Sequence, residues 1–262
     1  MKIITYPDGG KYVINDNNET SLVYKINTYE DLFLLKSIKD ANPYLKEIII
    51  PCMFQQQHDR RFNQNESFEL KLVCDFINSC TFEKVKVFHP HSDITPTLLN
   101  NCEVITNKDY IIKVLLKIKS LENLIFMSAD AGGFKPLIQL AGILEWNETF
   151  SASKSRNPTT HKLTQLIDKQ DFQGKDILII DDLCVYGGTF KGLATMLKER
   201  NCGKLYLAIS HITVQNLGKD PVTDYFDKVF TTNSKYDMYY HEKNNEYGEI
   251  PSNLEIIKLP SS

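Results

Sequence analysis

The sequence has no excess of basic residues and no long apolar segment. Its 262 residues include 30 Lys and Arg against 33 Asp and Glu, a net charge of −3, so the basic surface of a nucleic-acid-binding protein is not expected. No apolar run approaches the roughly 20 residues that span a bilayer, and Met1–Pro7 is too short and too polar for a signal peptide. We therefore expect a cytoplasmic protein that binds neither nucleic acid nor membrane.

Cysteine and histidine are few and poorly spaced for metal binding. The six cysteines form no C-x-x-C pair, which argues against a zinc site and against a disulfide framework. Most of them lie in apolar segments, so we expect reduced thiols in the core. His89 and His91 form an isolated H-x-H pair, which is weak evidence for a metal site when taken alone.

Three common site motifs are also missing. Without G-x-x-x-x-G-K-[ST] a P-loop nucleotide site is excluded, and without G-x-G-x-x-G a Rossmann dehydrogenase is disfavoured. The absence of G-x-S-x-G disfavours an α/β-hydrolase. Any phosphate chemistry must therefore use a different loop.

The apolar pattern predicts an α/β fold with a mainly parallel sheet, because strand-like runs alternate with helical periodicity. Helices are expected over 66–79, 108–118 and 188–200, whereas the first three strands lack helices between them and should form an antiparallel edge. Strands are expected at 3–5, 11–14, 21–25, 47–50, 84–88, 103–105, 124–127, 149–152, 176–180, 204–210 and 228–231. We expect two domains, 1–106 and 107–238, with the apolar end of segment 239–262 returning to the first.

The most informative segment is 177–190, where an apolar strand runs into Asp181 and Asp182, then a glycine-bearing loop and a helix. Open α/β sheets bind ligands beyond the carboxyl ends of such strands. Gly187, Gly188 and Thr189 would offer backbone N–H groups and a hydroxyl to a phosphate, and the carboxylates would accept from sugar hydroxyls. The segment therefore suits a ribose 5-phosphate group; the alternative is that one acid caps the helix and the other is solvated.

Two further strand ends carry polar groups. Asp130 could hold hydrated Mg²⁺ or an anomeric hydroxyl, with Gly132 and Gly133 allowing a phosphate to approach, or the glycines could simply form a turn with positive φ. His91 could donate to an ATP phosphate or contact Mg²⁺ through water, although a lone histidine is more often structural.

Two polar loops contain cations. In Gln55–Asn65, Asp59 and Arg60 could clamp a nucleotide or form a subunit salt bridge. In Ser151–His161, Lys154 and Arg156 could belong to a lid over the transferring phosphates or to an ordinary solvated loop.

Together these segments resemble the ribose-phosphate pyrophosphokinase (PRPP synthetase) family, in that family's order and over nearly the whole chain. The ordered set is far more specific than any single motif. The matching segments are 6–10 (F-S-D-G-E in the family), 50–61 (I-P-Y-x-x-Y-A-R-Q-D-R-R/K), 68–79 (the following helix), 87–98 (D-x-H-S/A), 130–133 (D-x-G-G), 154–156 (K-R-R) and 177–190 (D-D-x-x-D-T-A-G-T).

The resemblance implies two similar phosphoribosyltransferase-type domains and attack of a ribose 1-hydroxyl on the β-phosphorus of ATP, with release of AMP. It also implies Mg²⁺ as cofactor and a homodimer or larger homo-oligomer, because the first motif reaches a neighbouring subunit's ATP. It assigns ATP to Tyr6, Asp8, Asp59, Arg60 and His91, the metal to His91 and Asp130, the ribose phosphate to Asp181, Asp182, Tyr186, Gly187, Gly188 and Thr189, and catalysis to Lys154 and Arg156.

The chain departs from the family pattern at the ribose motif, where Val185 replaces an Asp, Tyr186 a Thr and Gly187 an Ala. Because an aromatic face can stack on a base, we hypothesise that the acceptor is ADP-ribose rather than ribose 5-phosphate, as in divergent phage relatives associated with NAD salvage. Two other classes stay open: a catalytically silent regulatory subunit and a phosphoribosyltransferase that consumes PRPP.

Overall fold

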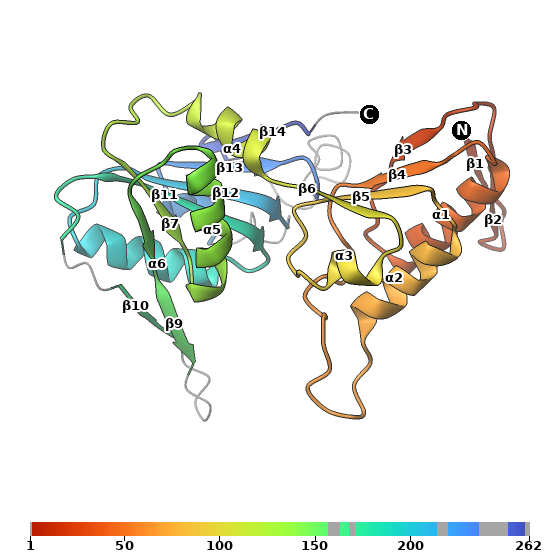
Figure 1. Cartoon of the computed structure of the whole chain (residues 1–262), viewed down its shortest axis with the longest axis horizontal. Helices are drawn as coiled ribbons and strands as arrows, with labels where there is room; N and C mark the ends of the chain where they lie inside the picture. Colours follow the sequence, from red (N-terminus) through yellow and green to blue (C-terminus); the bar gives the residue numbers. More distant parts are fainter. Residues whose placement is uncertain (1, 157–162, 168–170, 214–219, 236–250, 260–262) are drawn as a thin grey trace. The chain divides into compact units, whose positions relative to one another are not determined.

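The computed structural model describes residues 2–156, 163–167, 171–213, 220–235 and 251–259. The chain forms two compact units, one up to Asn107 and one from Lys108 to Leu259 (Figure 1). This boundary lies one residue beyond the one expected from the sequence.

The first unit is built on a four-stranded parallel sheet in the order β3-β4-β5-β6, and helices α1 and α2 pack against it (Figure 1). Along β4, Ile48 and Ile50 are fully buried while their neighbours are half-buried, as expected for alternating side chains. The elements are β3 Ser21–Val23, α1 Tyr29–Ala41, β4 Glu47–Ile50, α2 Glu69–Ser79, β5 Lys84–Phe88, α3 Thr95–Leu98 and β6 Cys102–Ile105.

The antiparallel edge expected for the first three strands is only partly correct. Strands β1 (Lys2–Thr5) and β2 (Lys11–Ile14) form a separate antiparallel hairpin, whereas β3 joins the main sheet parallel to β4. The sequence reading missed α1, which makes the crossover that a parallel connection requires. The start of α1 is a capping box in which Thr28 and Asp31 each accept from the other's backbone N–H.

The second unit contains a six-stranded parallel sheet in the order β14-β13-β12-β11-β7-β8. Strands β7 and β12 are buried along their whole length, as expected for central strands of a parallel sheet covered on both faces. The strands are β7 Leu124–Ser128, β8 Thr149–Ser151, β11 Asp176–Cys184, β12 Leu205–Ile212, β13 Lys228–Thr232 and β14 Leu254–Ile257.

The last strand corrects the prediction that the end of the chain returns to the first domain. Strand β14 pairs in parallel with β13 of the second unit, with Leu254 opposite Val229. Leu254 and Ile257 are buried, and Leu254 belongs to the core cluster of the second unit. An apolar segment could complete either sheet, and only the packing selects one.

The second unit also contains helices on the sheet and a short hairpin. Helix α5 was not expected, because its sequence carries three glycines and Pro136. The buried face of α6 is formed by Phe190, Leu193, Ala194 and Leu197. The elements are α4 Lys108–Leu115, α5 Ala131–Ile143, β9 Ser153–Arg156, β10 Leu163–Leu166, α6 Gly188–Glu199 and the 3-10 helix η2 Val222–Tyr225. In the described part of the chain, no helix is long and apolar enough to cross a membrane.

Candidate active site

In the second unit, Asp130 lies two residues after the end of strand β7 and caps helix α5. Its Oδ1 accepts from the backbone N–H groups of Gly132 at 3.0 Å and Gly133 at 3.2 Å, and its backbone is extended. Because both glycines lie in the first helical turn, the alternative of a glycine turn with positive φ is wrong. A Cβ placed on Gly133 would lie 3.8 Å from Asp181 Oδ1, so the start of α5 adjoins Asp181.

Two serines hold the backbone of Asp130. The Ser128 hydroxyl donates to the Asp130 carbonyl oxygen over 3.0 Å, and the Ser151 hydroxyl lies 3.3 Å from the same oxygen. Ser128 ends β7 and is fully buried, and Ser151 ends β8. The ends of two neighbouring strands therefore fix the peptide that carries the candidate carboxylate.

Asp181 and Asp182 lie within β11 rather than beyond it, because the strand continues to Cys184 through pairing with β12. Asp181 Oδ1 accepts from the Asp182 backbone N–H at 2.9 Å. Helix α6 is instead capped at Gly187, where no described side chain makes the cap hydrogen bond. The alternative that one acid caps this helix is therefore wrong.

The three carboxylates concentrate negative charge in one place. Burial, and after it the charges of Asp182 and Asp130, raise the pKa of Asp181 to about 8. A cation or several hydroxyl donors would relieve this charge, which is the chemistry expected of a sugar and its metal.

The loop before α6 has the features of a phosphate site. Gly187 adopts a left-handed conformation with φ 73°, which glycine accepts without steric cost, so the loop turns sharply into the helix. Among the described residues, no atom lies within 4 Å of where a Cβ of Gly188 would stand, so the start of α6 is open there. Tyr186 is 81% exposed and leaves its ring accessible.

Lys154 and Arg156 lie in β9, paired with Gln165 and Leu163 of β10. The segment expected to be a polar loop therefore begins as a β-hairpin. Its remainder, 157–161, lies outside the described residues.

In the first unit, Asp59 is at the centre of a hydrogen-bonded cluster. Arg60 contacts both carboxylate oxygens, at 2.8 and 3.0 Å, and the Ser92 hydroxyl donates to Oδ2 at 2.8 Å. The hydrogen bond from Arg60 lowers the pKa of Asp59, and the Ser92 bond and the charge of His91 act in the same direction. The Gln56 amide oxygen accepts from the His91 backbone N–H at 3.1 Å.

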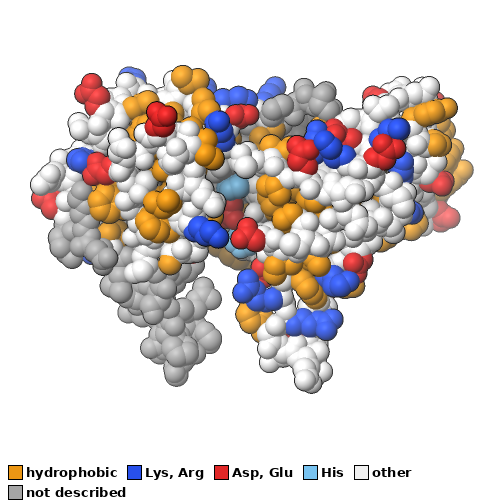
Figure 2. Space-filling model, viewed as in Figure 1, with side chains coloured by type: hydrophobic (Ala, Val, Ile, Leu, Met, Phe, Trp, Pro, Cys, Tyr) orange, Lys and Arg blue, Asp and Glu red, His pale blue; other side chains and the backbone are white. Residues whose placement is uncertain are grey.

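This cluster joins two of the segments singled out from the sequence, since Asp59 precedes α2 and His91 follows β5. Lys and Arg side chains are visible on the protruding segment that joins β4 to α2 (Figure 2). Gln56 and Ser92 were not among the site residues predicted from the sequence, although both lie in segments that carry predicted site residues.

Tyr6 and Asp8 lie in the turn between β1 and β2. Tyr6 is 54% exposed, and its ring stacks on Tyr12 with centroids 5.5 Å apart. Asp8 Oδ1 accepts from the Gly10 backbone N–H at 2.9 Å, so its carboxylate helps to shape the turn.

No group of three or more His, Cys, Asp or Glu suited to a metal ion occurs among the residues that the structure describes. Mg²⁺ does not require one, because it usually keeps several waters and binds one or two carboxylates plus substrate phosphates. Asp130 fits this requirement, whereas His91 belongs to the other unit.

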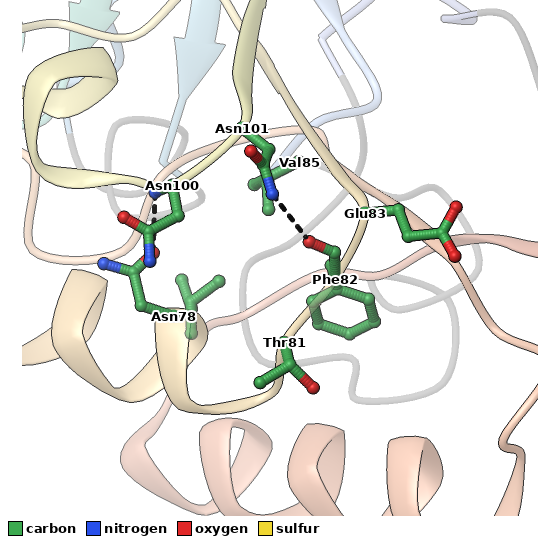
Figure 3. A pocket seen from close by; sticks show the side chains of 8 residues that line it. Asn78, Thr81, Phe82, Glu83, Val85, Asn100 and Asn101 are labelled. Carbon is green, nitrogen blue, oxygen red and sulfur yellow. Dashed lines mark hydrogen bonds between the residues drawn. The ribbon is translucent and has the colours of Figure 1, made fainter.

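A pocket of about 360 Å³ in the first unit is lined by none of the candidate residues (Figure 3). It is lined at the amino ends of β5 and β6, whereas His91 follows the carboxyl end of β5. Its amides already serve the fold: Asn78 accepts from the Asn100 backbone N–H, and Asn101 donates to the Phe82 carbonyl.

Comparison with known proteins identifies the family of this chain. The model of the phosphoribosyl transferase domain matches residues 97–243. Ribose-phosphate pyrophosphokinase of Aquifex aeolicus is 28% identical, covering 88% of this chain and 78% of its own, and that of Pyrococcus furiosus is 26% identical, covering 89% and 85%.

A solved structure supports the fold. Phosphoribosylpyrophosphate synthetase from Mycobacterium smegmatis matches with a TM-score of 0.76 and 16% identity, covering 98% of this chain and 85% of that chain. The α/β fold, the resemblance to ribose-phosphate pyrophosphokinases and the prediction of an enzyme are confirmed. The chain belongs to the phosphoribosyl transferase domain family.

Proposed function

We propose that this enzyme transfers the β,γ-diphosphate of ATP to the 1-hydroxyl of a ribose 5-phosphate moiety. The hydroxyl oxygen bonds to the β-phosphorus, the bond from that phosphorus to the oxygen bridging to the α-phosphate breaks, and AMP leaves with that oxygen. The main support is the juxtaposition of Asp130 and Asp181, with Asp182 adjacent, in the unit whose helix α6 starts at an open glycine loop.

The acceptor would bind at the second unit. The carboxylates of Asp181 and Asp182 accept hydrogen bonds from the ribose hydroxyls, and the segment from Tyr186 to Thr189 surrounds the 5-phosphate at the positive end of α6. This orientation holds the 1-hydroxyl in a fixed position, which is a large part of what an enzyme contributes to phosphoryl transfer.

ATP would bind at the Asp59 cluster of the first unit. Arg60, already oriented by Asp59, offers fixed N–H groups to a nucleotide, and the backbone at His91 is fixed by Gln56. Lys154 and Arg156 of the hairpin supply positive charge to the transferring group. Asp130 of the second unit would hold Mg²⁺, which supplies neutralisation of phosphate charge when it is bound, and His91 of the first unit would contact a metal through water.

A homodimer or larger assembly follows from the roles of Tyr6 and Asp8. Both lie in the turn of a hairpin that is separate from the main sheet, and the exposed Tyr6 ring is available to a nucleotide base. In the proposed assembly, this turn contacts the ATP of a neighbouring subunit.

We propose ADP-ribose as the acceptor, giving a pyrophosphorylated ADP-ribose for NAD salvage, with ribose 5-phosphate and PRPP as the second candidate pair. The exposed Tyr186 ring beside the phosphate loop supports ADP-ribose, because stacking on a nucleic-acid base contributes about 1–3 kcal/mol in other proteins.

AMP release decides between these acceptors. The protein is incubated with ATP, Mg²⁺ and either ADP-ribose or ribose 5-phosphate, and the product is identified by mass. We expect AMP with ADP-ribose and a roughly tenfold loss of that preference in Tyr186→Ala. If AMP formed with ribose 5-phosphate and not with ADP-ribose, the choice of acceptor would be wrong. No AMP with either would contradict the diphosphokinase and favour a silent subunit, and turnover of PRPP without ATP would favour a phosphoribosyltransferase.

A further inference from the structure

Thr213, the residue after strand β12, binds two consecutive carbonyl groups at the end of β11. Its backbone N–H donates to the Cys184 carbonyl at 3.1 Å, and its hydroxyl donates to the Val185 carbonyl at 2.9 Å. The two acceptors are the last residue of β11 and the first residue of the loop that leads into α6. One side chain thus extends the strand pairing into the loop by one more residue.

The position of Thr213 is itself well fixed. Ile212, just before it, is fully buried and pairs with Cys184, which is 1% exposed. A hydrogen bond from the Gly187 backbone N–H also reaches the Cys184 thiol, whose pKa burial raises to about 12. The loop is therefore held at two points, by the contact of Gly187 with the buried Cys184 thiol and by the contact of Val185 with Thr213.

These contacts determine where the loop's N–H groups point. In a trans peptide the C=O and N–H bonds lie in one plane and point in opposite directions. The Val185 carbonyl faces Thr213, so the N–H of Tyr186, in the same peptide unit, points away from β12. If the carbonyl lost its donor it could rotate, and the Tyr186 N–H would rotate with it.

We propose that Thr213 is a positioning residue that sets the phosphate-binding conformation of loop 185–188. This inference deepens the proposed function and rests on it, because the loop is there assigned to the 5-phosphate of the acceptor. Thr213 does not contact the acceptor in this proposal. It acts through the Val185 carbonyl, so its removal weakens acceptor binding while ATP binding and the chemical step change little.

The test compares Thr213→Val, which replaces the hydroxyl by a methyl group of similar shape, with Thr213→Ser, which keeps it. Thr195→Val is the matched control, because the Thr195 hydroxyl also donates to a backbone carbonyl, that of Lys191, on the exposed face of α6. Binding of ribose 5-phosphate and of ADP-ribose to the full chain is measured by calorimetry without nucleotide. The KM for each substrate and kcat are measured separately.

We expect Thr213→Val to weaken binding of the acceptor about three- to tenfold and to raise its KM similarly, with kcat and the KM for ATP within twofold of wild type. Thr213→Ser and Thr195→Val should bind like wild type. If Thr213→Val bound the acceptor with wild-type affinity, or if Thr213→Ser lost as much acceptor affinity as Thr213→Val, the role of Thr213 would be wrong and the proposed function would stand. A wild type that binds neither sugar phosphate would instead contradict the proposed function on which it rests.

Discussion

The hydroxyl oxygens of Ser128 and Ser151 lie 3.0 Å apart at the ends of two adjacent parallel strands. Both also lie within hydrogen-bond distance of the Asp130 carbonyl. Ser151 is followed, after Ala152, by the strand that carries Lys154 and Arg156. The same small contact therefore connects the peptide of the proposed metal-binding carboxylate to the base of the proposed catalytic hairpin.

Ser151→Ala should lower the affinity for Mg²⁺ as well as the stability of the protein. Removing one partly buried hydrogen bond should cost about 1 kcal/mol in the free energy of unfolding. The Mg²⁺ concentration for half-maximal activity should rise severalfold, because Asp130 loses one of its two supports. Ser37→Ala is the control, since its hydroxyl donates to Phe33 on the exposed side of α1. An unchanged Mg²⁺ dependence would show that Ser128 alone suffices.

Arg60→Gln should raise the pKa of Asp59. The hydrogen bond from Arg60 is the largest cause that lowers this pKa. A lowered folded pKa stabilises the protein above the unfolded value of about 3.9, and the stabilisation is lost as pH falls through the folded value. The variant should therefore lose less stability than wild type as the pH falls below about 4, and this loss should end at a higher pH.

An NMR titration of the Asp59 carboxyl group checks this prediction directly. Arg61→Gln, one residue further along the same exposed segment, is the matched control and should leave the Asp59 titration in place. If both variants shift the titration equally, the effect comes from the general charge of the segment and not from the Asp59–Arg60 contact.

Asp181→Asn should stabilise the protein at high pH and not at low pH. The folded pKa of Asp181 is raised to about 8, so the folded state binds more protons than the unfolded state between about pH 4 and pH 8. Stability from this group is present in full below the unfolded pKa and is lost as pH rises through the folded one. Asn carries no such charge and should remove this pH dependence.

Urea unfolding at pH 4.5 and at pH 8.5 measures the effect. We expect the gain from Asp181→Asn to be larger at the higher pH, together with weaker binding of the ribose hydroxyls. Equal changes at both pH values would show that Asp181 is already ionised in the folded protein across this range.

Lys154→Ala should lower kcat by about 10²- to 10³-fold, the usual cost of losing one group that stabilises transition-state charge. It should leave acceptor binding near the wild-type value, because Lys154 lies in β9 and not in the loop before α6. Lys198→Ala, on an exposed position near the end of α6, is the control for a lost positive charge. A kcat within twofold of wild type would remove Lys154 from the catalytic group.

The alternation of apolar runs with helical periodicity was enough to predict the α/β class, because buried parallel strands need apolar side chains on both faces. The order of the charged and glycine-bearing segments was enough to predict the family. Helices α1 and α5 were missed. In α5, glycine and proline lower helix propensity, and packing of Leu137, Leu140 and Ala141 outweighs them.

Only the tertiary structure decided which groups meet. The sequence of Leu254–Ile257 determined an apolar strand, and burial against β13 placed it in the second unit rather than the first. The sequence was enough to select Asp130 and Asp181 as candidate site residues and to show that Val185 departs from the family's ribose motif. Their supports, Ser151 and Thr213, come from neighbouring strands, because strand pairing brings together residues that are far apart along the chain.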